Sequence, residues 1–272
     1  MRSMVEGSLP KVLAAAALFL LGALLMIAAL QTQMLFPTGA VGPAGPLPAG
    51  AAKVSLETPD GDTLHGIHIA GASKSSLRTL ILGFGGNAWN GSDVAAYLHQ
   101  LYPQADVIVF HYRGYRPSTG SPSAKALLAD APLVHRFGVD RVKPDRTIAV
   151  GFSIGSGVAA SLAKYGKLDG LILVTPFDSL KAAASDLYPW LPIGPFFEHE
   201  MTTADYLKGA KLPVAIIAGE YDTLIRPART DALRKKVPNL VFDRTIKGAG
   251  HNDIYLRPEF EKAMRDALAA LR

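Results

Sequence analysis

A chain of 272 residues with 49% apolar side chains can bury one sizeable core, which favours a single domain of α/β-barrel or doubly wound size. The net charge of +5 comes from basic residues spread along the chain, without the basic stripe and interleaved aromatic residues of a nucleic-acid-binding protein. The chain has no cysteine, which excludes disulfides, catalytic thiolates and cysteine-based zinc sites.

The first element is an apolar segment, residues 12–30, which contains neither a charged residue nor a proline. A helix rises about 1.5 Å per residue, so a helix of this length reaches roughly the 30 Å of a bilayer core. A cleaved signal peptide is the alternative, but the end of the segment is a poor cleavage site. Arg2 and Lys11 precede the segment, and the positive-inside tendency places such residues in the cytoplasm. We expect a transmembrane signal anchor at 12–30, with residues 1–11 cytoplasmic and the remainder extracytoplasmic, which means periplasmic in a bacterium.

Residues 31–52 include a stretch rich in proline and glycine, 37–48, that carries no charge. Such a composition is typical of a linker or of an extended arm lying against a domain. We expect residues 53–272 to form that domain. Its first segments, 53–58 and 64–69, alternate apolar and polar residues around a turn, which predicts an antiparallel hairpin at a sheet edge.

After the hairpin, apolar runs alternate with helical patterns. The expected strands are 79–84, 107–110, 148–150, 171–174, 214–218 and 240–245. The expected helices are 93–101, 123–137, 154–165, 231–237 and 259–271. This order predicts an α/β fold with a mostly parallel, doubly wound sheet. In the hairpin, His65 and His68 occupy opposite faces of one strand, so they are interpreted as ordinary strand residues and not as a metal pair.

The strand expected at 79–84 runs into Gly85-Gly86-Asn87. Glycines between a strand and a helix allow backbone N–H groups to face a ligand. Two interpretations compete: a cradle for a phosphate, and one arm of an oxyanion hole. The glycine patterns of phosphate and dinucleotide sites are absent from this segment, and a serine motif further along the chain favours the oxyanion arm.

That serine motif is Gly151-Phe152-Ser153-Ile154-Gly155, between an apolar run and a small-residue helical pattern. This is the sequence form of a nucleophile elbow, in which the serine occupies a sharp strand-to-helix turn. The two glycines leave room for the chain to cross itself closely. The N-terminal N–H groups of the following helix point to where negative charge develops during acyl transfer. We therefore predict that Ser153 is a catalytic nucleophile.

A serine nucleophile needs an imidazole base, and a carboxylate that fixes the tautomer of that imidazole. Asp222 follows the strand expected at 214–218, and His251 lies in a glycine-flanked loop after the last expected strand. The chain order Ser153, Asp222, His251 therefore predicts a catalytic triad, because ligand chemistry collects at the carboxyl ends of strands in open α/β sheets.

Between the motifs lies an apolar, proline-rich insert, residues 188–197. One interpretation is a lid or a wall of an acyl pocket. The other is plain packing over the edge of the sheet. The sequence does not decide between them.

The motifs taken together span nearly the whole chain after the apolar segment. They are Gly86-Asn87-Ala88, Tyr112-Arg113-Gly114-Tyr115, Gly120-Ser121-Pro122-Ser123, Gly151-Phe152-Ser153-Ile154-Gly155, Pro176-Phe177-Asp178-Ser179-Leu180, Tyr188-Pro189-Trp190-Leu191-Pro192, Gly219-Glu220-Tyr221-Asp222 and Gly248-Ala249-Gly250-His251-Asn252-Asp253. With these motifs the chain resembles an α/β-hydrolase, and specifically the Bem46-like group of membrane-anchored members.

The resemblance implies a serine hydrolase that acts on an ester, thioester or amide without a cofactor or metal. It maps the oxyanion donors onto the backbone N–H groups of Asn87 and Ile154. The chain departs from the group at two positions: Gly85 stands where the group has histidine, and Arg116 stands where glycine is expected. Neither change removes a catalytic group.

The expected function is cleavage of an ester or thioester through an acyl-enzyme. The apolar segment and the apolar insert favour a lipid or acylated substrate. Two alternatives stay open: a peptidase of the serine aminopeptidase type, which shares the same motifs, and a non-catalytic, membrane-tethered binding protein with the same fold.

Overall fold

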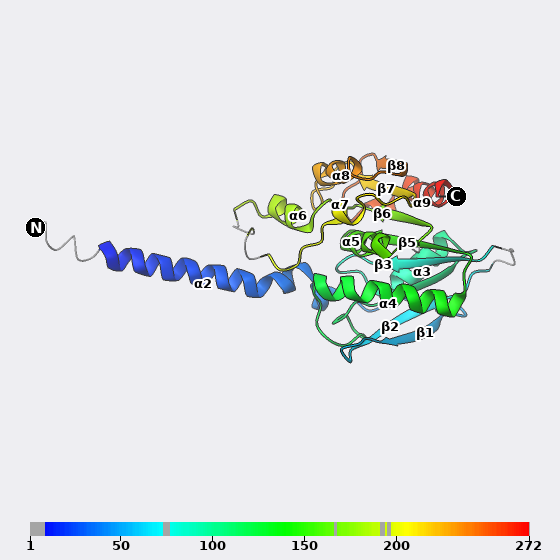
Figure 1. The fold of residues 1–272 in the computed structure, drawn as a ribbon, viewed down its shortest axis with the longest axis horizontal. Helices are drawn as coiled ribbons and strands as arrows, with labels where there is room; N and C mark the ends of the chain where they lie inside the picture. Colours follow the sequence, from blue (N-terminus) through cyan, green and yellow to red (C-terminus); the bar gives the residue numbers. More distant parts are fainter. Residues whose placement is uncertain (1–8, 73–76, 166–167, 191–193, 195–196, 272) are drawn as a thin grey trace, which may run out of the picture.

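The computed structural model describes residues 9–72, 77–165, 168–190, 194 and 197–271. These residues form an eight-stranded sheet with helices on both faces, from which one long helix, α2 (Leu9–Leu35), projects (Figure 1). In chain order the strands are β1 (Ala52–Glu57), β2 (Thr63–Ile69), β3 (Thr79–Phe84), β4 (Asp106–Phe110), β5 (Arg146–Phe152), β6 (Gly170–Val174), β7 (Val214–Gly219) and β8 (Leu240–Ile246).

The strands lie side by side in the order β1-β2-β4-β3-β5-β6-β7-β8. β1 pairs with β2 and β2 pairs with β4 in antiparallel fashion, whereas every pair from β4 to β8 is parallel. The predicted edge hairpin and the mostly parallel sheet are therefore confirmed. Because β3, β5, β6 and β7 run parallel, their carboxyl ends and the loops that follow meet along one edge.

Helices cover the sheet on both faces, and each face has its own apolar core. The helices are α3 (Gly91–Leu101), α4 (Ala124–Val142), α5 (Ile154–Ser161), α6 (Leu180–Leu187), α7 (Thr203–Tyr206), α8 (Pro227–Arg234) and α9 (Pro258–Ala270). Alternate strand side chains divide between the faces: Leu80 and Leu82 pack with α4 and α5, and Ile81 packs with α3 and α9. Figure 1 shows α4 and α5 in front of the sheet. The apolar runs of the central strands are continuous because both faces are covered.

Three predicted helices differ from the structure by more than two residues at one end or at both. α4 begins after the predicted Ser123, whose side chain accepts the N–H of Ala126, but it continues to Val142 through Pro132. Burial of Val134 and Val142 against the sheet outweighs the backbone hydrogen bond that the proline cannot make. The pattern at 154–165 ends as a 3₁₀ turn, and the pattern at 231–237 corresponds to α8, which begins earlier, at a proline suited to a first helical turn.

The predicted transmembrane segment at 12–30 lies within α2. Within the described ranges, no helix combines the length and the hydropathy that crossing a membrane requires, so this span is not confirmed. The boundaries 1–11, 31–52 and 53–272 stay predictions. Half of the apolar insert, namely 191–193 and 195–196, falls outside the described residues, as do residues 1–8.

Candidate active site

The elbow, residues 151–155, joins β5 to α5 through a backbone that few residues tolerate. Ser153 has φ 51° and ψ −119°, a left-handed conformation that costs about 1–3 kcal/mol. A Cβ on Gly151 would lie 2.3 Å from the Gly155 carbonyl oxygen, and one on Gly155 would lie 2.1 Å from the Phe84 carbonyl oxygen. Neither position can carry a side chain, so both glycines of the motif are required by close backbone contacts.

The structure brings three sequence-predicted residues into one hydrogen-bonded chain. His251 Nε2 lies 3.0 Å from Ser153 Oγ, and His251 Nδ1 lies 2.7 Å from Asp222 Oδ2. Asp222 is 4% exposed and His251 is 8% exposed, while Ser153 is half-buried. Because an ionised carboxylate only accepts, Nδ1 carries the imidazole proton and Nε2 is left to accept the serine hydroxyl.

Asp222 and His251 are held by the backbone of their own loops. The second oxygen of Asp222, Oδ1, accepts the N–H groups of Leu224 at 2.9 Å and Ile225 at 2.7 Å, which fixes the carboxylate. The two loops also approach each other closely, since a Cβ on Gly219 would lie 2.6 Å from the Ala249 carbonyl oxygen. This packing sets the distance between the acid and the imidazole.

Asp253 closes the loop that carries His251. Its Oδ1 accepts the N–H of Gly250 at 2.7 Å, and its other oxygen forms an ion pair with Arg257. The hydrogen bond from Arg257 lowers the pKa of this carboxyl group, with a further contribution from the Gly250 N–H. The carboxylate therefore stays ionised and keeps both partners.

The loop between β3 and α3, residues 85–90, passes directly beside the serine. A Cβ placed on Gly86 would lie 3.9 Å from the Cβ of Ser153. Asn87 follows Gly86 and is half-buried, and Ile154 is the first residue of α5, so the helix offers its N–H no partner. The two predicted oxyanion donors thus lie on segments that flank Ser153.

Comparison with known proteins places the chain in a family. A family model for the alpha/beta hydrolase fold matches residues 80–198. An uncharacterized protein of Mycobacterium tuberculosis is 32% identical over 250 residues, which cover 89% of this chain and 88% of that protein. The chain belongs to the α/β-hydrolase family. The predicted resemblance to the Bem46-like group is also confirmed, because Protein bem46 of Schizosaccharomyces pombe is 29% identical over 80% of the hydrolase and 76% of its own length.

Two further matches, one curated relative and one solved structure, are informative. The Lysophosphatidylserine lipase ABHD12 of Danio rerio is 28% identical over 73% of the hydrolase and 60% of its own length. Among solved structures, the Pyrococcus furiosus esterase Pf2001 superposes with a TM-score of 0.67 at 21% identity, covering 84% of the hydrolase and 94% of the esterase. At that identity, the likeness to the esterase shows the fold alone.

An aromatic cluster beneath the site of the hydrolase escaped the sequence analysis. Phe152 of the elbow, Trp89 of the β3–α3 loop and Tyr255 after His251 contact one another, with ring centroids 5.0 to 6.0 Å apart. Phe152 lies within the serine motif, Trp89 follows Asn87, and Tyr255 follows His251. An aromatic residue in or just after each motif is the signal that could have revealed the cluster. Burial raises the pKa of the Tyr255 phenol, so this ring stays neutral in the apolar cluster.

A hydrogen bond from the loop after β4 also holds the β3–α3 loop. The hydroxyl of Tyr112 donates to the Gly85 carbonyl oxygen at 2.9 Å, and burial raises the pKa of this tyrosine well above its ordinary value. The next residue, the buried Arg113, forms ion pairs with Asp130 of α4 and with the turn residues Asp60 and Asp62. The loop that carries Tyr112 is therefore tied to both α4 and the edge hairpin.

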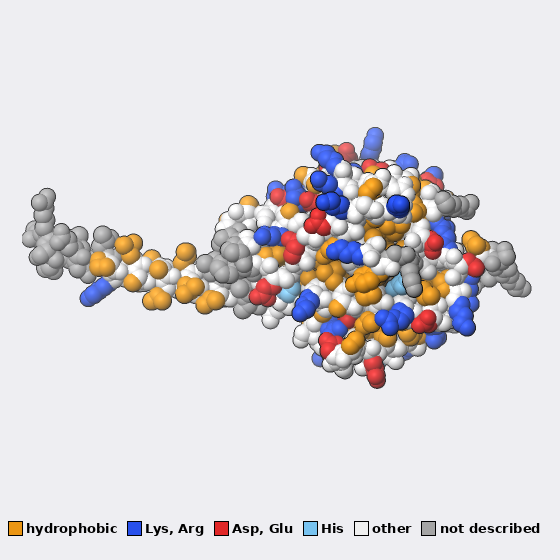
Figure 2. All heavy atoms as spheres, viewed as in Figure 1, with side chains coloured by type: hydrophobic (Ala, Val, Ile, Leu, Met, Phe, Trp, Pro, Cys, Tyr) orange, Lys and Arg blue, Asp and Glu red, His pale blue; other side chains and the backbone are white. Residues whose placement is uncertain are grey.

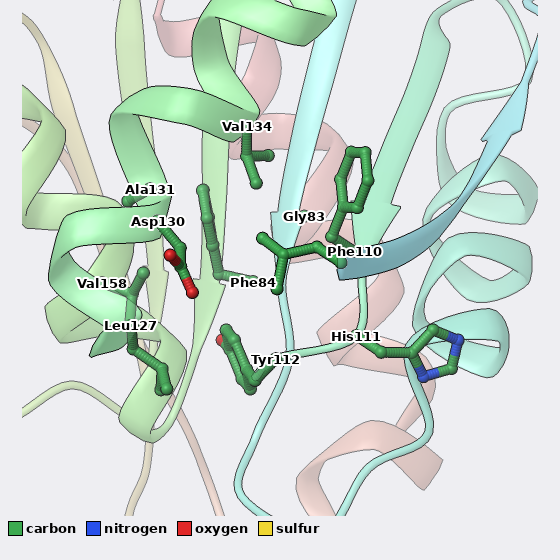
Figure 3. Close-up of a pocket in the computed structure, with 11 residues that line it drawn as sticks. Gly83, Phe84, Phe110, His111, Tyr112, Leu127, Asp130, Ala131, Val134 and Val158 are labelled. Carbon is green, nitrogen blue, oxygen red and sulfur yellow. The ribbon is translucent and has the colours of Figure 1, made fainter. Parts of the chain in front are cut away.

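Figure 3 shows a small cavity beside Tyr112 and Asp130, with the ring of His111 directed away from it. Its volume is about 10 Å³, which is room for one water molecule at most. This cavity is too small for a substrate. The described part of the chain also contains no group of three or more metal-binding side chains.

Proposed function

We propose that this protein is a serine hydrolase that cleaves an ester or thioester through a covalent acyl-enzyme. The observation that carries the proposal is the hydrogen-bonded chain from Ser153 through His251 to Asp222, at 3.0 and 2.7 Å. These distances suit proton transfer between heavy atoms, and the three groups have the right chemistry in the right order.

In the proposed acylation step, His251 Nε2 removes the proton from Ser153 Oγ while the oxygen attacks the acyl carbonyl carbon. Asp222 holds the imidazole with Nε2 toward the serine and stabilises the positive charge that forms on the ring. The tetrahedral intermediate collapses, and the proton on Nε2 passes to the leaving alcohol or thiol. In the second half, His251 activates a water molecule, which attacks the acyl carbon and releases the acid and free Ser153.

The proposed oxyanion donors are the backbone N–H groups of Ile154 and Asn87. Two features support them. Ile154 starts α5, where the helix dipole favours negative charge, and the β3–α3 loop runs beside Ser153. The position of this loop next to the serine favours an oxyanion arm over a phosphate cradle.

The experiment that tests the proposal is labelling with a fluorophosphonate, which reacts with an activated serine. We expect the wild type to take up label and Ser153→Ala to take up none, with Ser185→Ala, an exposed serine on α6, as the matched control. Hydrolysis of a short-chain ester by Ser153→Ala should fall by about 10⁴–10⁶. An unlabelled wild type would support the non-catalytic alternative, and selective cleavage of aminoacyl anilides would support the peptidase alternative.

We further propose a lipid or acylated substrate and attachment to a bilayer through α2. Figure 2 shows apolar side chains along this projecting helix, where Phe19 is 80% exposed and Leu18 is 70% exposed. Exposed apolar area costs about 25 cal/mol per Å², which favours contact with lipid. A relative that is named a lysophosphatidylserine lipase supports the same substrate class.

Two measurements test the lipid and location proposals. Hydrolysis rates across esters of increasing acyl length should rise beyond acetyl, and a sharp optimum at acetyl would contradict a lipid substrate. In cells, the protein should sediment with membranes and resist extraction by alkaline carbonate. The proposed extracytoplasmic position of the hydrolase domain predicts cleavage by a protease added to that side, and protection there would contradict it.

A further inference from the structure

The segment from the end of α2 to the start of the domain, residues 31–45, lies against the β3–α3 loop. We call this segment the N-terminal strap. Hydrogen bonds join it to the loop and to the start of α3 at three places: from Asn87 Nδ2 to the Leu35 carbonyl at 3.4 Å, from Asn90 Nδ2 to the Gly42 carbonyl at 3.0 Å, and from the Gly45 N–H to Asp93 Oδ1 at 2.8 Å. The strap therefore follows the same loop that carries the proposed oxyanion donor.

The first contact arises from how α2 ends. Leu35 is the last residue of the helix, so its carbonyl has no intrahelical partner, and Pro37 has no N–H with which to continue the ladder. The side-chain amide of Asn87 supplies the missing donor. The side chain of the residue proposed as an oxyanion donor is thus bound to the end of a distant helix, while its backbone N–H is left for the substrate.

The second contact uses one side chain for two tasks. Asn90 Oδ1 accepts the N–H of Ser92 at 3.0 Å and caps α3, while Asn90 Nδ2 donates to the Gly42 carbonyl. The end of the β3–α3 loop is therefore fixed by both the helix it enters and the strap it lies against.

The strap is itself anchored to the domain by buried contacts. Phe36 is 2% exposed, and its ring meets the edge of His199 with centroids 5.2 Å apart. His199 Nδ1 accepts the N–H of Ala124, so Nε2 carries the proton and donates to Thr32 Oγ1 at 2.7 Å. Burial lowers the pKa of His199, which keeps the ring neutral and suited to this pair of bonds. Nearby, Gln31 Oε1 accepts a backbone N–H at 3.1 Å.

We propose that the N-terminal strap positions the β3–α3 loop, and with it the backbone N–H of Asn87 that is the proposed oxyanion donor. The end of α2 then contributes to catalysis by holding this loop in place. The inference rests on the proposed serine hydrolase function. It assigns positioning roles to Phe36 and to the side chains of Asn87 and Asn90. Misplacing a reacting group by about 1 Å can cost up to 10²-fold in rate, so loosening the strap lowers kcat more than it changes KM.

The test compares the wild-type chain of residues 1–272 with Asn90→Asp, Phe36→Ala and Asn87→Ala on a short, water-soluble ester in detergent. Asn90→Asp keeps the oxygen that caps α3 and removes the donor to Gly42, and Asn87→Ala keeps the backbone N–H. Each kcat is expressed per active site, as titrated with fluorophosphonate, so that unfolded protein does not count. We expect kcat to fall about tenfold for Phe36→Ala and Asn87→Ala and about threefold for Asn90→Asp, with KM within about twofold.

Two controls separate positioning from stability and from lipid contact. Asn239→Asp removes an amide donor to the Lys211 carbonyl, a bond of 2.8 Å far along the chain, and should leave kcat unchanged. Leu18→Ala removes an exposed apolar side chain of α2 and should also leave kcat unchanged on the soluble ester. The double variant Phe36→Ala/Asn87→Ala should lose little more than the larger single loss, because releasing Phe36 also frees the neighbouring Leu35 carbonyl, to which Asn87 donates.

The outcomes are distinguishable. Unchanged kcat in all three strap variants, or a rise in KM alone, would overturn the positioning role while the labelled wild type still supports the serine hydrolase. Additive losses in the double variant would also overturn it. A wild type that takes no label would overturn both proposals, because the strap would then have no oxyanion arm to hold.

Discussion

The elbow and the β3–α3 loop flank the same serine but are held by different interactions. The elbow is set by backbone contacts: Gly151 packs against Gly155, and Gly155 packs against the end of β3, both so closely that no side chain fits. The β3–α3 loop is held by side-chain hydrogen bonds to distant segments: it accepts one from the Tyr112 hydroxyl, and its own Asn87 and Asn90 side chains donate to the N-terminal strap. A position that only glycine can occupy is visible in the sequence, whereas the hydrogen-bond partner of a side chain is not.

The largest expected effect concerns the chain of hydrogen bonds behind the elbow. Asp222→Asn presents an amide to His251 and favours the wrong imidazole tautomer, so kcat should fall about 10⁴-fold while the unfolding free energy changes little. Kinetics with a short ester and urea denaturation measure the two quantities, with the exposed Asp231→Asn as the control. Retention of more than a tenth of the activity would contradict the role of the carboxylate.

The next effect separates the two regions directly. In Gly155→Ala the new Cβ meets backbone oxygens of both Phe84 and Gly85, neither of which can move aside. We expect a loss of about 4 kcal/mol in the unfolding free energy and of at least about 10² in kcat. Gly22→Ala, where a Cβ meets open space outside the strap, is the control. An unfolding free energy of Gly155→Ala equal to that of the control would contradict the requirement for glycine at this position.

A smaller effect is expected on the side-chain-held loop. Tyr112→Phe leaves the Gly85 carbonyl without its donor, so the unfolding free energy should fall by about 1 kcal/mol. Because the loop keeps its contacts with the strap, kcat should fall only about threefold. Tyr165→Phe, at an exposed ring, is the control. A loss of kcat as large as that of Gly155→Ala would erase the distinction between the two regions.

The smallest effect is a pH dependence of the strap. Burial lowers the folded-state pKa of His199 below its ordinary value of 6.5, so the unfolded chain binds the proton more readily. The contribution of His199 to stability is therefore complete above about pH 6.5 and decreases as the pH falls toward the folded-state pKa. Urea denaturation between pH 7 and 5 should show a shallower decline for His199→Gln than for the wild type. Parallel curves would exclude His199 as the source.

Much of the fold could be predicted from the sequence because the central strands are buried on both faces and are therefore continuously apolar. The edge hairpin was equally clear from its alternation around a turn. Helix ends were less predictable. Proline disfavours the interior of a helix, but α4 continues through Pro132 because its burial against the sheet outweighs that preference. Tertiary packing, which no local pattern records, decides such cases.

The sequence by itself determined the chemistry that this hydrolase could attempt: an elbow with Ser153, followed in order by Asp222 and His251. Each lies in or beside a glycine-containing motif, and Gly151, Gly155 and Gly219 are required by close backbone contacts, so the motifs are visible in the sequence. Only the tertiary structure decided what surrounds that chemistry. The aromatic cluster, the Tyr112 hydrogen bond and the N-terminal strap join residues far apart in the chain. Nothing in the sequence around these side chains shows which partner each one meets.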